Sequence, residues 1–289
     1  MDLRVIIENM PSPQDRYDLH THSRHSDGTT TPAEIAKLAA GLGLAGFALT
    51  DHDTANGWDE AREAAAEHGL DFLPGFEMTT MHRGRNTHLL AYGADPQDDE
   101  MAALLNLLGG ARQRRAERMV EKLAQDFDIT WEDVAAVGIR AIGRPHIADA
   151  LVRKGIVADR DTAFATLLSS KSPYYAYAES VKTVDAIRIV CAAGGVPVLA
   201  HPAAKRNRSV ITPAELEQLI AAGLLGVEMD HPENSPELLT ELQRTVADFP
   251  LLITGSSDFH GAGKINRVGE ETTAAETVLR IRELARIKH

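Results

Sequence analysis

The sequence predicts an α/β fold in which a parallel sheet, most simply a barrel, is covered by helices. Strand-like and helix-like segments alternate in both the first and the last third of the chain, which is typical of βα units. The length of 289 residues suits one such barrel. His, Asp and Glu residues follow the strand-like segments where they end, and they can meet only if the strands converge on one rim.

The first four strands are predicted before residue 97. Two of them alternate with helices: strand 17–22 (YDLHTH), a helix from Thr31 through Leu42, strand 45–53 (AGFALTDHD) and a helix over 55–68. Pro32 suits the first position of the first helix. Two further strand-like segments follow, 71–80 (DFLPGFEMTT) and 85–93 (RNTHLLAYG).

The last third of the chain repeats the alternation. Strands are predicted over 194–202, 224–230 and 250–260, with helices over 180–193, 212–222, 235–248 and 273–287. Residues 98–178 have helical periodicity and no clear strand. We therefore expect a barrel in two parts, 1–97 and 179–289, interrupted by a helical subdomain over 98–178.

Composition excludes several classes of protein. The net charge of −12 and the pI of about 5.4 argue against a large nucleic-acid surface and against binding to duplex DNA. No apolar run is long enough to cross a membrane, and the N-terminus lacks the pattern of a signal peptide. A single cysteine excludes an intramolecular disulfide and fits a reducing, cytoplasmic location. The sequence does not predict an oligomeric state.

The first two ligand-bearing segments are HTHSRHSDG and TDHDT. His20 and His22 are two positions apart on a strand, so their side chains share one face, and Asp27 follows in the next loop. A His-x-His pair on a barrel strand can hold a metal. The alternative is that the two histidines are simply polar residues at the end of a strand, which would give the same sequence pattern. His52 is flanked by Asp51 and Asp53, which are candidates to orient imidazole rings. The alternative is that Asp53 or Thr54 caps the following helix.

The remaining ligand candidates follow four more strands. Glu77 interrupts an apolar run, where a carboxylate is costly unless it is paired or bound to a metal. His88 lies among apolar residues, and a buried core histidine would look the same. His201 follows another strand, and the last strand is followed by Asp258 and His260.

Together these residues predict a polynuclear metal hydrolase. Nine candidates are spread over six of the seven predicted strands and the loops that follow them: His20, His22, Asp27, His52, Glu77, His88, His201, Asp258 and His260. Imidazole and carboxylate ligands without cysteine favour Mn²⁺, Zn²⁺ or Fe²⁺ over soft-metal chemistry. Clustered ions of this kind lower the pKa of a bound water and stabilise an in-line displacement.

The successive motifs YDLHTHSRHSDGTTTP, LTDHD, GFE, THLL, LAHP and GSSDFHG resemble those of the PHP (polymerase and histidinol phosphatase) family of phosphoesterases over residues 17–97 and 180–289. The resemblance implies a distorted (β/α)7 barrel with three divalent metal ions, Mn²⁺ above all. It implies that the first metal is held by His20, His22, Glu77 and Asp258, the second by Glu77, His88 and His201, and the third by Asp27, His52 and His260. A metal-bound hydroxide is then the nucleophile, with Asp258 and His201 among the catalytic residues.

The insertion narrows the expected substrate. GRPHIADALVRKG and KSPYYAY resemble a subgroup of 3′,5′-nucleotide bisphosphate phosphatases and related 5′→3′ exoribonucleases. Arginine suits bidentate recognition of phosphate, and tyrosine can stack on a base. The candidate substrate contacts are Arg144, His146, Lys171, Tyr175, Arg206 and Arg208.

The predicted reaction is removal of the 3′-phosphate from a nucleoside 3′,5′-bisphosphate such as adenosine 3′,5′-bisphosphate. The first alternative is a 5′→3′ exoribonuclease acting on short 5′-phosphorylated RNA. The alternative of another class is a non-catalytic metal-binding scaffold. The basic run RQRRAER is interpreted as a solvated helix face or, alternatively, as a flank for an RNA end. His68, His82, His231 and His289 are given no role, and that of His25 is left open.

Overall fold

The structure, a computed structural model, describes residues 15–135 and 142–285 of the chain. The expectation about a signal peptide falls mainly on residues 1–14, and the end of the last predicted helix on 286–287, so both lie outside the described residues. Among the described residues, no helix combines the length and the apolar character needed to cross a membrane.

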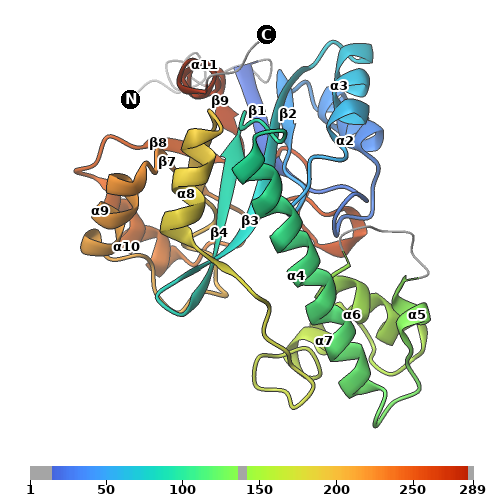
Figure 1. Cartoon of the computed structure of the whole chain (residues 1–289). Helices are drawn as coiled ribbons and strands as arrows, with labels where there is room; N and C mark the ends of the chain where they lie inside the picture. Colours follow the sequence, from blue (N-terminus) through green and yellow to red (C-terminus); the bar gives the residue numbers. More distant parts are fainter. Residues whose placement is uncertain (1–14, 136–141, 286–289) are drawn as a thin grey trace.

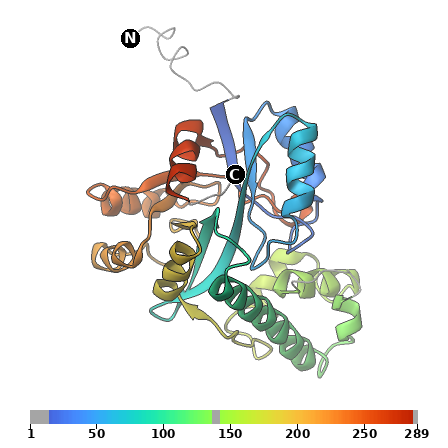
Figure 2. The same cartoon turned by 45° about the horizontal axis from the view of Figure 1, so that its top comes forward.

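In the part of the chain that the structure describes, one sheet of nine strands curls into a nearly closed barrel (Figures 1 and 2). Its strand order is β8-β7-β6-β4-β3-β2-β1-β9, with β5 paired to β3. The bounds are β1 Arg16–Thr21, β2 Gly46–Leu49, β3 Asp71–His82, β4 Arg85–Tyr92, β5 Val181–Lys182, β6 Val196–Leu199, β7 Gly226–Asp230, β8 Leu252–Gly255 and β9 Thr273–Ala274. The seven predicted strands and the α/β barrel are confirmed, and β5 and β9 are short additions.

The expectation of an all-parallel sheet is wrong at β4. This strand runs antiparallel to both of its neighbours, β3 and β6. Only Arg83 and Gly84 separate the paired residues His82 and Arg85, and both have positive φ angles. A two-residue turn of this kind can join only antiparallel strands, because a parallel connection needs a crossover of about a dozen residues.

Helices cover the outside of the barrel. In the barrel they are α2 Pro32–Gly41, α3 Trp58–Glu67, α8 Thr183–Ala192, α9 Pro213–Ala222, α10 Pro236–Val246 and α11 Ala275–Leu284, and η2 Gly261–Gly263 is a single 3₁₀ turn. The predicted helices are confirmed with small shifts at their ends. Both α2 and α9 begin with a threonine cap, a proline at the first position and a glutamate that completes a capping box.

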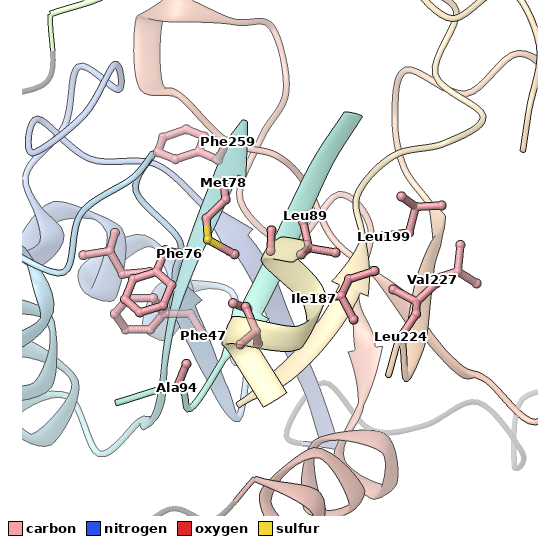
Figure 3. Close-up of a cluster of buried hydrophobic side chains, with 14 of the residues drawn as sticks. Phe47, Phe76, Met78, Leu89, Ala94, Ile187, Leu199, Leu224, Val227 and Phe259 are labelled. Carbon is pink, nitrogen blue, oxygen red and sulfur yellow. The ribbon is translucent and has the colours of Figure 1, made fainter. Parts of the chain in front are cut away.

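The apolar core has two layers. Phe76 and Met78 of β3 and Leu89 of β4 point outward and pack with Ile187 of α8 (Figure 3). Alternate residues of the same strands point inward, where Leu90 packs with buried residues of other strands. This period of two places Glu77 and His88 on the inner side of the barrel wall.

The segment between β4 and β5 is helical, as predicted. Its helices are α4 Asp99–Leu123, α5 Trp131–Ala135, α6 Arg144–Arg153 and α7 Arg160–Ala165. The first turns of α4 pack on the barrel through Met101 and Leu104, whereas Met119 and Leu123 at its other end belong to a separate apolar cluster of the insertion. A helix of 25 residues is about 37 Å long, so α4 carries α5–α7 away from the barrel (Figure 1).

The interpretation of RQRRAER as a solvated helix face is wrong for Arg112 and Arg115. Arg112 donates to the carboxylate of Asp53 and to the hydroxyl of Thr79, which lie in the barrel. Arg115 donates to the backbone oxygen of Ala176. Two basic side chains of α4 therefore connect the barrel, the helix and the 171–180 segment.

Candidate metal centre

The candidate ligands converge on one end of the barrel from the outlets of β1, β2, β6 and β8 and from the interiors of β3 and β4. His201 and Asp258 adopt positive φ angles of 31° and 52°, two and three positions after the ends of β6 and β8. Such a backbone is strained for residues other than glycine and persists where the surroundings impose it. His88 reaches the same rim from the first half of β4 because that strand runs in the opposite direction.

A first group surrounds one oxygen each of Glu77 and Asp258. The Nε2 atom of His20 lies 3.3 Å from Glu77 Oε2 and 3.4 Å from Asp258 Oδ1. The corresponding distances from His22 Nε2 are 3.2 and 3.3 Å. These four residues form one of the three clusters of possible ligands among the described residues.

The second group uses the other oxygen of Glu77. Its Oε1 atom lies 2.6 Å from His88 Nδ1 and 2.8 Å from His201 Nε2. Although burial raises the pKa of Glu77, the imidazoles of His88 and His52 hold it well below the usual range. One carboxylate therefore joins two groups of imidazoles.

The third group is built on Asp27. Its carboxylate lies 3.3 Å from His260 Nε2 and 3.6 Å from His52 Nε2. His22 also approaches, with its Nδ1 atom 3.8 Å from Asp27 Oδ1. A neutral imidazole has one free lone pair and can therefore bind one metal. If His22 binds the metal of the first group, then Asp27, His52 and His260 remain for the third.

In the first and third groups, several ligand atoms fit a divalent metal better than they fit one another. His20 Nε2, both ring nitrogens of His22, Asp27 Oδ1 and Asp258 Oδ1 are buried without a hydrogen-bond partner among the described residues. Buried polar atoms without partners are rare, and each is costly. Two ligands about 2.1 Å from one ion lie about 3.0–3.4 Å apart, which is the spacing in the first group.

Sequence reasoning missed two buried residues beside this cluster, both associated with β7. Glu228 accepts from the backbone N–H of His201 at 2.8 Å and pairs with His20 Nδ1 at 3.0 Å. His231, which received no role from the sequence, lies buried with Nε2 3.3 Å from Asp258 Oδ2. The signal was present, since the sequence VEMDHP places an acid and a histidine at a strand outlet.

Lys264 is a further residue that the sequence did not single out. Its ammonium lies 2.5 Å from Asp258 Oδ2 and 3.6 Å from Glu233 Oε1. Burial raises the pKa of Asp258, but the charges of Lys264 and His20 hold it well below the usual range. Lys264 therefore keeps the Asp258 carboxylate ionised and fixes its orientation.

The two acids beside His52 have separate structural roles. Asp51 accepts from Ser23 and Ser26, which shapes the loop that carries Asp27. Asp53 accepts from Arg112 and from the backbone of Thr79. Neither acid bonds to the His52 ring, and α3 begins after Gly57 without a side-chain cap, so both readings offered for this segment are wrong.

A cavity of about 590 Å³ adjoins the second ligand group. Its lining includes His88 and His201 together with four arginines, Arg85, Arg144, Arg206 and Arg208. Arg85 is paired with Glu215 and Arg206 with Glu233. Arg144 has no acidic partner among the described residues, and its guanidinium lies over the ring of Phe164 at 5.4 Å. The predicted contacts Arg144, Arg206 and Arg208 thus face the same space as two candidate ligands.

The other three predicted substrate contacts lie elsewhere. His146 is buried at the start of α6, where its Nδ1 atom accepts from the backbone N–H of Gly143. Lys171 is exposed and, like His146, does not line this cavity. Tyr175 lines a second, smaller cavity.

Comparison with known proteins agrees with this geometry. The PHP domain model matches residues 18–130. A 3′,5′-nucleoside bisphosphate phosphatase from Chromobacterium violaceum is 34% identical over 261 residues, covering 86% of this chain and 89% of the relative. A 5′-3′ exoribonuclease from Haemophilus influenzae is 33% identical over 250 residues, covering 85% and 90%.

The fold also has a solved counterpart. The crystal structure of a protein from Bifidobacterium adolescentis, described as a metal-dependent phosphoesterase, superposes with a TM-score of 0.90 at 45% identity, covering 93% of this chain and 96% of the other. The fold, the His and carboxylate clusters and these relatives define a hydrolase that acts on phosphoesters. The chain belongs to the PHP family, as its motifs predicted. We therefore set aside the alternative of a non-catalytic scaffold.

Proposed function

We propose that the chain removes the 3′-phosphate of nucleoside 3′,5′-bisphosphates. The observation that carries this proposal is the cavity of about 590 Å³, in which candidate ligands His88 and His201 face Arg144. Its volume lies within the range of about 300–1,000 Å³ that is usual for small-molecule sites. A substrate with two phosphates could place one at the metal centre and the other against the arginines.

Three divalent metal ions, Mn²⁺ in our proposal, are assigned to the three ligand groups. The first would be held by His20, His22, Glu77 and Asp258, the second by Glu77, His88 and His201, and the third by Asp27, His52 and His260. When bound, such ions supply Lewis-acid stabilisation and lower the pKa of water. The unpartnered ligand atoms of the first and third groups, and the gathering of possible ligand atoms in all three, support this assignment.

Other side chains of the protein would then position the metal ligands and the substrate. Glu228 holds the His20 ring with Nδ1 as donor, which leaves Nε2 free to face Glu77 and Asp258. Lys264 keeps Asp258 ionised and oriented. Arg144 would bind the second phosphate, and this remote contact would hold the scissile ester in place.

The insertion would cap the substrate site. In this proposal the chain divides into barrel parts 1–97 and 179–289 and a capping subdomain over 98–178. Arg144 at the first turn of α6 reaches the cavity beside the candidate ligands. His146 and Lys171 remain proposed contacts of the same subdomain, as do Arg206 and Arg208 of the barrel.

The second candidate function is 5′→3′ exonucleolysis of short 5′-phosphorylated RNA. It would use the same metal centre. The 5′-phosphate of the RNA would take the place against the arginines that the second phosphate of a bisphosphate takes in the first proposal. The relative from Haemophilus influenzae supports it as strongly as the bisphosphate phosphatase supports the first, at 33% against 34% identity. A small nucleotide or short RNA is therefore the expected partner of the site.

Phosphate release measured with Mn²⁺ tests the first function. We expect turnover of nucleoside 3′,5′-bisphosphates well above that of nucleoside 3′-monophosphates, which lack the remote phosphate. Equal turnover of the two would refute the role of the arginines. No turnover of either, with metal bound, would refute the function itself.

A further inference from the structure

A second cavity of about 280 Å³ lies where the insertion meets the barrel. Its lining comes from the loop after β2, from the β3–β4 hairpin, from α4 and from the segment that leads into β5. Met81 and Asn86 belong to the hairpin, Leu108 and Arg115 to the helix, and Tyr175 and Tyr177 to the segment. With Asp53 from the loop after β2, four parts of the chain thus build one hollow.

The second cavity is a neighbour of the first. Asn86 and Ser170 line both of them, so these two residues lie between the hollows. Two positions after Asn86 along β4 comes His88, a candidate ligand that faces the first cavity. An extended ligand with one phosphoester near His88 could therefore continue past Asn86 and Ser170.

The lining has the chemistry of a base-binding site. Tyr175 and Tyr177 meet edge to face with ring centroids 5.2 Å apart, and Tyr177 is 77% exposed. Their backbones are fixed by α4, because Lys122 donates to the backbone carbonyl oxygen of Tyr175 and Arg118 to that of Tyr177. An aromatic ring that is open to solvent on a fixed backbone is a platform for stacking of a nucleobase.

The charge of the lining favours an anionic ligand. Arg115 lies over the Tyr175 ring at 4.8 Å, and its Nη2 atom is buried without a partner among the described residues. The two acids of the lining are already paired, Asp53 with Arg112 and Glu179 with Arg114. Arg115 therefore leaves a positive charge in the lining that is not balanced by either acid.

We propose that this second cavity binds the nucleotide that follows the scissile phosphoester in an RNA substrate, with Tyr177 stacking on its base. The inference rests on the proposed phosphoesterase site and extends it to an oligonucleotide. The first cavity has the size for one nucleotide. The second would give an RNA an additional contact that a bisphosphate cannot make.

The test compares two substrates, a nucleoside 3′,5′-bisphosphate and a 5′-phosphorylated dinucleotide, with the full chain and Mn²⁺. In Tyr177→Ala, the ratio of kcat/KM for the dinucleotide to that for the bisphosphate should fall at least about fivefold, from the loss of one base stack. Tyr177→Phe keeps the ring and should keep the wild-type ratio. Tyr174→Phe is the matched control, since Tyr174 bonds to Asp126 and lines neither cavity.

A direct readout uses 2-aminopurine as the second base of the dinucleotide. Its fluorescence should be quenched on binding to wild type and less quenched on binding to Tyr177→Ala. An unchanged substrate ratio and unchanged quenching in Tyr177→Ala would overturn the inference, as would a wild type that hydrolyses the bisphosphate and not the dinucleotide. Both results leave the phosphatase function intact, whereas a wild type inactive on both substrates would overturn the function as well.

Discussion

Glu228 offers the sharpest test of how the buried surroundings of the centre support it. The carboxylate receives two contacts, from His20 Nδ1 at 3.0 Å and from the His201 backbone N–H at 2.8 Å. In Glu228→Gln one of the two oxygens becomes an amide NH₂, which cannot accept. Whichever way the amide turns, one buried donor faces another donor, at a cost of about 1–3 kcal/mol.

The cost should appear as weaker metal binding, because both contacts orient candidate ligands. Loss of such an orienting partner typically lowers metal affinity about 10- to 100-fold. Titration calorimetry of Mn²⁺ into the metal-free full chain measures this loss directly. The matched control is Glu215→Gln, which also changes a buried carboxylate but lies on α9, where glutamine can still complete the capping box. Affinity within twofold of wild type in Glu228→Gln, or the same loss in both variants, would refute the reasoning.

Three further results are expected. Arg144→Met keeps the packing against Phe164 but loses a charged donor worth about 1.5–3 kcal/mol. The kcat/KM for a bisphosphate should therefore fall about 10- to 100-fold, and that for a 3′-monophosphate should change little. Equal losses of kcat/KM for the two substrates would contradict the anchor role. Removal of metal by a chelator should lower the Tm in scanning calorimetry by about 4–5 °C for each ion bound, relative to protein with Mn²⁺ at 100 times its Kd. An unchanged Tm would argue against metal binding to the folded chain. Burial lowers the pKa of His146, so the stability that its neutral form provides is present above about pH 6.5 and is lost as the pH falls. The urea midpoint of His146→Gln should therefore depend less on pH between 7 and 5 than that of wild type. Urea midpoints that change with pH in parallel in the two proteins would contradict this.

The barrel and its ligand candidates were predictable because both depend on local patterns. An apolar strand that ends in a polar outlet can be read from a dozen residues, and the nine candidates all lie in such outlets or strands. Converging strands then bring the candidates together without further information. The direction of β4 was also readable, from the two-residue turn at Arg83 and Gly84, but the parallel reading of the sheet overlooked it.

The partners of the site depend on contacts between residues far apart in the sequence. Glu228 meets His20 across 208 positions, and Arg112 meets Asp53 across 59. The sequence VEMDHP marks Glu228 and His231 as polar residues near a strand end, but the strand pattern fixes only the face of each side chain and not the residues that it meets. The same holds for Lys264, whose role comes from the distance of 2.5 Å to Asp258.

The sequence by itself determined the barrel, the family and the residues that can hold metal, because these follow from strand periodicity and from the order of short motifs. Only the tertiary structure decided how the insertion meets the barrel. The sequence suggested Arg144 and Tyr175 as substrate contacts but not which space they face. The contacts of α4, α6 and the 171–180 segment determine that Arg144 lines the first cavity and that Arg115, Tyr175 and Tyr177 line the second. The physical reason is that a cavity is a property of surfaces brought together by packing, and no single segment of the chain contains it.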